Sequence, residues 1–396
     1  MGWDYGEDYY LYFEELFEQT LNKYKRISMT KNWLKTYQGK TIVKGYSNWL
    51  GVDLLYRQTK NNYLRMKTNI LILLVMATFF PCFSQDTLVA LDKGLTTVNY
   101  PFEVKFHTFK SQGQDLKMAY VDVLPSNPNG KTVLLMHGKN FSIAYWEQTI
   151  KALGKEDFRV IAADQIGFGK STKPEYYQYS FQQLAQNTKS ILDSLKINKI
   201  ILLGHSMGGM LATRFALSYP EMTDKLILEN PIGLEDYKVL TSYQTIDVNY
   251  QSELKNTVES YRNYQLKYYY DNTWKPQYDR WLNLLAGWTL HKDYPIVAWN
   301  AALTMDMIFT QPVVYEFGNI KCPTLLIIGT RDRTAIGRER APKNIQSKMG
   351  LYNELGKKTQ KAIPNSTLVE LDNVGHLPHI ETFERFIKPL TEFLKK

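Results

Sequence analysis

Short apolar runs and amphipathic segments alternate along the chain from about residue 95 to its end. Runs of strand length, apolar throughout or alternating in polarity, lie at residues 104–109, 117–123, 132–136, 159–163, 199–203, 225–228, 324–328 and 367–371. Residues 180–195 have the apolar spacing of an amphipathic helix, with Ser180 as N-cap and Gln183 three residues later. Strands that alternate with helices predict an α/β fold, in which helices flank a mostly parallel central sheet.

The motif G-x-S-x-G occupies residues 204–208, between the run at 199–203 and a helical segment at 209–217. A strand, this motif and a helix form a nucleophile elbow, a strained turn that lifts a serine hydroxyl clear of the sheet. The two glycines permit close packing of the strand against the helix. The pattern predicts Ser206 as a nucleophile, and the alternative is a plain tight turn.

A serine hydroxyl is a weak nucleophile, so it needs a base, and the base needs an orienting acid. After a nucleophile elbow these partners follow in the order acid, then histidine. Asp332 follows the run at 324–328, and His376 follows the last run at 367–371. Ligands of such sheets bind beyond the carboxyl ends of the strands. We therefore predict His376 as the base and Asp332 as the acid; the alternatives are a turn or N-cap role for Asp332, and Glu229 as the acid.

The other five histidines are expected to pack, brace loops or cap helices: His107, His137, His205, His291 and His379. His379 could face the same pocket as His376, because it follows three residues later. We expect it instead to point along the first turn of the final helix.

The oxyanion of a tetrahedral intermediate requires preorganised N–H donors. One expected donor is the backbone N–H of Met207, directly after the predicted nucleophile. The other is the backbone N–H of Lys139, in the loop after the strand at 132–136. The lysine side chain also places a cation near the predicted site.

These motifs resemble the α/β-hydrolase superfamily, in its branch of small hydrolases with a helical cap. The resemblance covers about residues 100–396 and depends on residues 137–138, 164–171, 204–209, 329–332 and 375–378. It implies a core formed by residues 95–232 and 319–396. Serine at position 206 argues against the dehalogenase and epoxide-hydrolase branches, which use aspartate there. His205 and Met207 differ from the elbow typical of proline iminopeptidases, which argues against peptidase activity.

Residues 233–318 are expected to form the helical cap. The segment is dense in aromatic residues: Tyr261, Tyr264, Tyr268, Tyr269, Tyr270, Trp274, Tyr278, Trp281, Trp288 and Trp299. Four apolar side chains in it have helical spacing: Trp274, Tyr278, Trp281 and Leu285. Most of the rings are expected to pack the cap against the core, and some to line an apolar cleft suited to an acyl chain or an aromatic ring.

Composition narrows the class of partner. Of 396 residues, 44% are hydrophobic and 22% are charged, which suits a globular protein with a large core. The net charge of +9 is uneven, because residues 1–20 are acidic and the following stretch to residue 67 is basic. The body is only mildly basic, so we expect a small-molecule substrate and no nucleic acid. Two cysteines, Cys82 and Cys322, cannot form a disulfide framework or a cysteine zinc site.

Residues 66–84 have the pattern of a secretory signal peptide. A short positive segment precedes an apolar run, and small residues allow cleavage after Ser84. We expect Met66 to be the native start, residues 1–65 to be an extension of unknown role, and the mature protein to be periplasmic or secreted. The alternatives are a membrane anchor formed by residues 70–83 and a buried hydrophobic helix.

The predicted function is that of a serine hydrolase without a cofactor or metal. Ser206, His376 and Asp332 would cleave carboxylic esters of small or medium apolar substrates through an acyl-enzyme. One alternative is hydrolysis of carbon–carbon bonds in vinylogous diketones of the 2-hydroxy-6-oxo-dienoate type. The other is a binding protein without catalytic activity on the same fold.

Overall fold

The computed structural model describes residues 34–37, 40–43, 55–56 and 88–396. The chain divides into two compact units, Met1–Ser84 and Gln85–Lys396. In the first unit, β1 (Leu34–Tyr37), β2 (Lys40–Val43) and β3 (Leu55–Tyr56) form an antiparallel sheet. The predicted signal segment at 66–84 and most of the extension at 1–65 lie outside the described residues.

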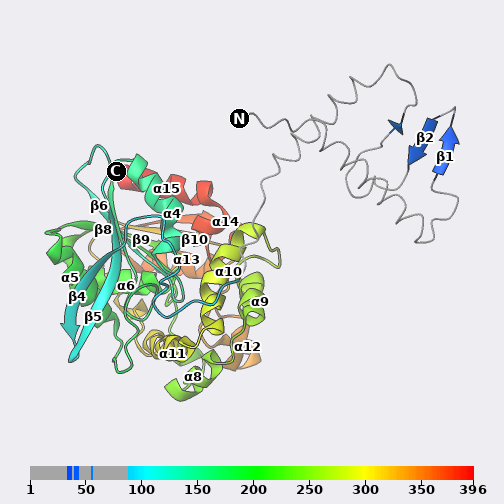
Figure 1. Cartoon of the computed structure of the whole chain (residues 1–396). Helices are drawn as coiled ribbons and strands as arrows, with labels where there is room; N and C mark the ends of the chain where they lie inside the picture. Colours follow the sequence, from blue (N-terminus) through cyan, green and yellow to red (C-terminus); the bar gives the residue numbers. More distant parts are fainter. Residues whose placement is uncertain (1–33, 38–39, 44–54, 57–87) are drawn as a thin grey trace, which may run out of the picture. The chain divides into compact units, whose positions relative to one another are not determined.

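The second unit is built on one eight-stranded sheet, shown in Figure 1. Its strands are β4 (Lys105–Ser111), β5 (Gln114–Val123), β6 (Thr132–Met136), β7 (Arg159–Ala163), β8 (Ile200–His205), β9 (Thr223–Glu229), β10 (Thr324–Gly329) and β11 (Ser366–Leu371). The spatial order is β11-β10-β9-β8-β6-β7-β5-β4. β5 pairs antiparallel with β4 and β7, and the other neighbours are parallel. The predicted α/β class with a mostly parallel sheet is confirmed.

Helices cover both faces of this sheet. They are α4 (Glu147–Lys155), α5 (Phe181–Ser194), α6 (Met207–Ser218), α13 (Tyr352–Ala362) and α15 (Phe383–Lys395). Two short helices, α12 (Lys343–Gln346) and α14 (Pro378–Glu381), precede α13 and α15 along the chain. Side chains of a strand alternate between faces, so each central strand contributes to two cores. Leu134 and Leu202 pack in a cluster with residues of α5, α6 and α13. Val133 and Leu203 pack in a second cluster with residues of α4 and α15.

The chain between β9 and β10 is helical. It contains α7 (Tyr237–Leu240), α8 (Ile246–Glu253), α9 (Val258–Tyr268), α10 (Asp279–Ala286) and α11 (Tyr294–Thr310). α8 packs against α11 and α9 against α10, and these helices lie together in green to yellow in Figure 1. This is the segment expected to form a cap at 233–318. No helix in the described part of the chain is both long and apolar enough to span a bilayer.

Candidate active site

Ser206 lies in a strained turn between the end of β8 and the start of α6. Its backbone has φ 56° and ψ −121°, a conformation that a residue with a side chain rarely adopts. The flanking glycines allow this turn. A Cβ on Gly204 would lie 2.2 Å from the carbonyl oxygen of Gly208, and one on Gly208 would lie 2.1 Å from that of Met136. The close approach of strand and helix therefore explains why glycine stands at both positions.

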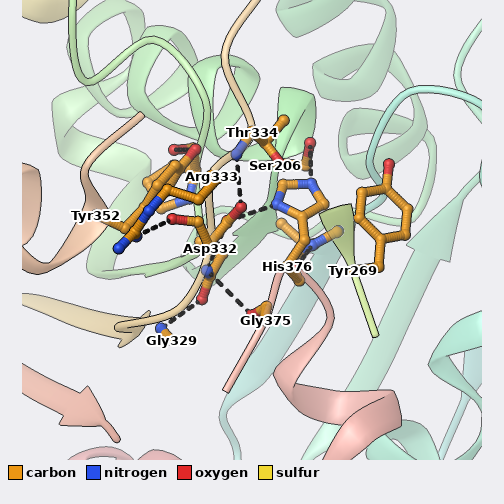
Figure 2. A network of polar contacts seen from close by, with 12 residues as sticks. Ser206, Tyr269, Gly329, Asp332, Arg333, Thr334, Tyr352, Gly375 and His376 are labelled. Atoms are coloured by element: carbon orange, nitrogen blue, oxygen red, sulfur yellow. Dashed lines mark hydrogen bonds and ion pairs between the residues drawn. The ribbon is translucent and has the colours of Figure 1, made fainter. Parts of the chain in front are cut away.

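The structure brings together the three side chains that we predicted as nucleophile, base and acid. His376 follows β11 and Asp332 follows β10, so both lie at the same edge of the sheet as Ser206. Ser206 Oγ lies 3.0 Å from His376 Nε2, and His376 Nδ1 lies 2.7 Å from Asp332 Oδ2 (Figure 2). All three side chains are buried. The arrangement can move a proton from the serine hydroxyl to the imidazole, while the carboxylate fixes the tautomer.

Asp332 is held in its charged form despite its burial. Burial on its own would raise the pKa of the carboxyl group. Two effects outweigh burial and lower the pKa of Asp332 below its ordinary 3.8. They are the electrostatic attraction of the His376 imidazolium and the hydrogen bonds from His376, Asn230 and the Thr334 N–H. The Thr334 N–H donates to Asp332 Oδ1 at 2.8 Å, and Asn230 Nδ2 donates to Oδ2 at 2.7 Å. A charged carboxylate can stabilise an imidazolium in the reaction.

Sequence reasoning missed the role of Asn230, which lies directly after β9. Its amide donates to Asp332 and to the Gly375 carbonyl, and its Oδ1 accepts from the Gly329 N–H at 2.9 Å. Its φ of 35° is one that asparagine tolerates better than most residues. The sequence did contain a sign of this role, because Asn230 follows the carboxyl end of a strand. The same criterion identified Asp332 and His376.

Tyr269 is a second residue that sequence reasoning did not single out for the site. Its ring stacks on the His376 imidazole, with centroids 4.9 Å apart and planes 26° apart (Figure 2). It follows α9, in the segment between β9 and β10. The aromatic density of that segment was visible in the sequence, but the contact with His376 depends on the fold.

The loop after β6 approaches Ser206 closely. A Cβ on Gly138 would lie 3.0 Å from Ser206 Cβ. Lys139 follows in this loop, and Met207 begins α6. Within residues 88–396, neither the Lys139 N–H nor the Met207 N–H donates to a protein acceptor. Both donors therefore suit the oxyanion role that we predicted for them.

His379 differs from its prediction. It is buried, and it lies in the short helix α14 instead of in the first turn of the final helix, α15. Its Nδ1 and its backbone N–H lie 2.8 and 2.9 Å from Glu229 Oε1, and its ring stacks on Trp146. Glu229, the alternative acid, thus pairs with His379 instead of His376. Burial raises the pKa of Glu229 to about 7 and lowers the pKa of His379 well below its ordinary value. Burial therefore favours the neutral form of both side chains.

His205 packs beside the site, in line with its prediction. Its Nε2 lies 2.7 Å from the His376 carbonyl oxygen, and its Nδ1 lies 3.1 Å from the Tyr145 hydroxyl. The Tyr145 hydroxyl also accepts a hydrogen bond from the Gly138 N–H. Through Tyr145, His205 therefore links the base to Gly138 in the loop after β6, which also contains Lys139.

A cavity of about 380 Å³ opens onto Ser206 and His376. Its wall has the apolar side chains that we expected, among them Phe141, Ile232, Leu285, Met305 and Ile308, but it also has polar ones. Tyr261, Tyr264 and Tyr269 line it, whereas Trp281 and Trp288 pack in the second core cluster. The cavity also has many uncharged polar residues on its wall: Asn140, Gln244, Asn249, Ser252, Asn256, Ser260, Gln265 and Thr334.

The charged groups on the wall are paired with one another. Lys139 Nζ lies 2.9 Å from Glu253 Oε1, and Arg340 Nη1 lies 2.8 Å from Glu339 Oε1. The Lys139–Glu253 pair joins the loop after β6 to the end of α8. Since each cation has an anionic partner, the cavity carries no strong excess of either charge.

A family model described as the alpha/beta hydrolase fold matches residues 131–383. The chain is also similar to the crystal structure of a probable hydrolytic enzyme from Pseudomonas aeruginosa PAO1. The two are 49% identical with a TM-score of 0.77, over 79% of this chain and 100% of that one.

Two curated relatives are similar over different lengths. An uncharacterized hydrolase, YugF, of Bacillus subtilis is 26% identical over 68% of this chain and 92% of its own length. A 2-hydroxy-6-oxononadienedioate/2-hydroxy-6-oxononatrienedioate hydrolase of Comamonas testosteroni is 39% identical, but over only 26% of this chain and 38% of its own length.

Proposed function

The chain belongs to the alpha/beta hydrolase fold family and is a hydrolase, and from this premise we propose that it cleaves carboxylic esters with Ser206 as nucleophile. The observation that carries the proposal is the 3.0 Å separation between Ser206 Oγ and His376 Nε2. The 2.7 Å contact of His376 Nδ1 with Asp332 supports it, because an oriented imidazole is a stronger base toward the serine.

The reaction follows from this geometry in two stages. Ser206 Oγ attacks the ester carbonyl while His376 Nε2 takes the hydroxyl proton, and Asp332 stabilises the imidazolium. The intermediate collapses when His376 returns the proton to the leaving alcohol, which leaves an acyl group on Ser206. Water, activated by His376, then attacks the acyl-enzyme and releases the acid.

The backbone N–H groups of Met207 and Lys139 are the proposed donors to the oxyanion of both tetrahedral intermediates. Their freedom from other protein acceptors within residues 88–396 supports this role. Loss of one such donor typically lowers turnover by about 10²–10³-fold. The cavity of about 380 Å³ suits substrates of small or medium size.

Hydrolysis of a carbon–carbon bond is the second candidate. The similarity to the Comamonas testosteroni hydrolase favours it, although this covers 26% of the chain. The same three side chains would then act on a vinylogous diketone instead of an ester.

A substrate panel separates the two candidates. Short and medium p-nitrophenyl esters and a 2-hydroxy-6-oxo-dienoate are incubated with the wild type, with Ser206→Ala and with Ser347→Ala, which alters an exposed serine. We expect ester hydrolysis by the wild type and by Ser347→Ala, and a loss of about 10⁴-fold or more in Ser206→Ala. Turnover of the dienoate alone would replace the ester proposal with the second candidate, and equal activity of Ser206→Ala would refute both.

A further inference from the structure

The side-chain amide of Gln265 is buried at the catalytic cavity without a partner. Gln265 is 1% exposed and contributes to the cavity wall that also holds Ser206 and His376. Neither its Nε2 nor its Oε1 has a hydrogen-bond partner among the described residues. A buried donor and acceptor that the fold leaves unpaired are costly, and natural proteins rarely keep such groups without a reason. Its place on the cavity wall suggests that the substrate provides the partner.

The position of Gln265 in α9 puts it near the reacting atoms. The Tyr269 N–H donates to the Gln265 carbonyl oxygen at 2.8 Å, so the two residues are about one helical turn apart, about 6 Å along the axis. The Tyr269 ring lies on the His376 imidazole. Gln265 therefore lies in the same cavity wall as the proposed nucleophile and base, one helical turn from the ring that contacts the base.

A second polar group on the same wall is also unpaired. Thr334 Oγ1 is buried and has no hydrogen-bond partner among the described residues. Its backbone N–H donates to Asp332 Oδ1, which fixes the residue beside the proton relay. The side chains of two residues on the wall thus carry buried polar atoms without a hydrogen-bond partner among the described residues.

The chemistry of these groups selects the substrate. A primary amide presents an N–H donor and a C=O acceptor in one plane, and its complement is a group that also has a donor and an acceptor. A carboxylate offers acceptors only, and the cations of the cavity, Lys139 and Arg340, are already paired with Glu253 and Glu339. An alkyl chain would leave both atoms of the Gln265 amide unpaired.

We infer that Gln265 is a specificity-determining residue which binds a neutral amide group of the substrate, with Thr334 Oγ1 as a second contact. The substrate class is then an ester with a carboxamide near the scissile bond. This inference depends on the proposed ester hydrolysis by Ser206. It replaces the apolar acyl group that the sequence suggested with a polar, uncharged one.

The test compares esters that differ only in the amide. The p-nitrophenyl esters of N-acetylglycine and N-acetyl-β-alanine are each paired with the alkanoate of the same shape, 4-methylpentanoate and 5-methylhexanoate. For the wild type we expect kcat/KM about 10- to 100-fold higher for at least one amide ester than for its alkyl partner. Gln265→Leu should abolish that preference, and Thr334→Val should reduce it.

Stability and a matched variant show whether the effect is one of recognition. Replacement of an unpaired buried amide by leucine should leave the unfolding temperature unchanged or raise it, so Gln265→Leu should fold. Gln244 also lines the cavity, but its Nε2 already donates to Asn249 Oδ1. Gln244→Leu should therefore keep the amide preference.

The outcomes separate the inference from the proposal beneath it. Ser206-dependent hydrolysis without an amide preference, or a preference that survives in Gln265→Leu, overturns the role of Gln265 and leaves the ester hydrolase standing. Absence of hydrolysis for both series overturns the proposed ester function and the inference with it.

Discussion

The side chain of Asn230 joins the segments that carry the proposed acid and the proposed base. It binds Asp332 Oδ2 directly, and it also binds the backbone of Gly329 and Gly375, which flank those segments. Each of these contacts spans roughly a hundred residues or more of sequence. Asn230 is buried and is not among the residues that line the cavity, so its role is to position the proposed relay.

We predict that Asn230→Ala and Asn230→Gly lower kcat about 10- to 100-fold, with a smaller effect on KM. A hydrogen bond to a charged group contributes about 1.5–3 kcal/mol, and here it orients the carboxylate that fixes His376. Steady-state kinetics with a p-nitrophenyl ester measures the effect. Glycine tolerates the φ of 35° and alanine does not. Full activity in Asn230→Gly would mean that only the backbone matters and would contradict the positioning role.

Glu229 makes a contribution to the stability of the protein that decreases as the pH rises. Burial raises its pKa from 4.5 to about 7, so the folded protein keeps a proton that the unfolded chain has lost. Its contribution to stability is therefore complete below about pH 4.5 and falls as the pH rises through about 7, by about 3 kcal/mol. The pKa values of His205 and His379 are lowered, mainly by burial, and these residues act in the opposite direction.

Comparison of the wild type with Glu229→Gln isolates this contribution, because both proteins contain the two histidines. We predict that the free energy of unfolding of the wild type, minus that of the variant, decreases between pH 5 and 8. Urea unfolding at a series of pH values measures it. A difference that stays constant or increases over this interval would show that Glu229 does not retain its proton in the folded state.

Among the secondary-structure elements, the junction of β8 with α6 leaves no room for a larger residue at Gly208. A Cβ on Gly208 would meet the Met136 carbonyl at 2.1 Å, and that oxygen belongs to the neighbouring strand β6. Backbone atoms cannot move aside as a flexible side chain can. Gly154 lies within α4, and apart from its chain neighbours and the backbone of its own helix, no atom of the described residues lies within 4 Å of the place of a Cβ there.

We predict opposite effects of one substitution at these two glycines. Gly208→Ala should destabilise the protein by more than about 2 kcal/mol and lower activity, since the strand or helix must shift. Gly154→Ala should stabilise it by about 0.5–1 kcal/mol, through helix propensity, with unchanged activity. Thermal unfolding and ester kinetics measure both. Similar unfolding temperatures for the two variants would contradict the close packing at the elbow.

All eight strands of the main sheet were predicted from apolar runs, and their observed ends differ by at most three residues. Ser206, Asp332 and His376 were identified because each lies at a strand end. The order of the strands was not predicted, since it is set by contacts between distant segments. The pairing of His379 with Glu229 was not predicted either. The two residues lie 150 residues apart, and no local sequence pattern around either of them indicates the other.

At the scale of the whole molecule, the unit Gln85–Lys396 contains the eight-stranded sheet, both core clusters and the catalytic cavity. The cavity combines side chains of the core with others from the segment between β9 and β10, such as Tyr261 and Gln265. The polar side chains of its wall were not predicted, because periodicity identifies which positions are apolar but not which polar side chains line a cavity.

The signal-like segment at 66–84 yields a prediction for the native protein. We expect export to be accompanied by cleavage after Ser84, so that the mature chain begins at Gln85. Mass spectrometry of the N-terminal peptide of the protein from its native host measures this directly. A mature protein that retains residues 66–84 would favour the anchor or the buried helix instead.

The central claim is that Ser206 is an activated nucleophile, and covalent labelling tests it most directly. The folded wild type is treated with a fluorophosphonate, and the modified peptide is identified by tandem mass spectrometry. We predict one phosphonyl group, on Ser206, which is absent in Ser206→Ala and forms much more slowly in His376→Ala. An unlabelled folded wild type, or a label on another residue, would contradict the claim.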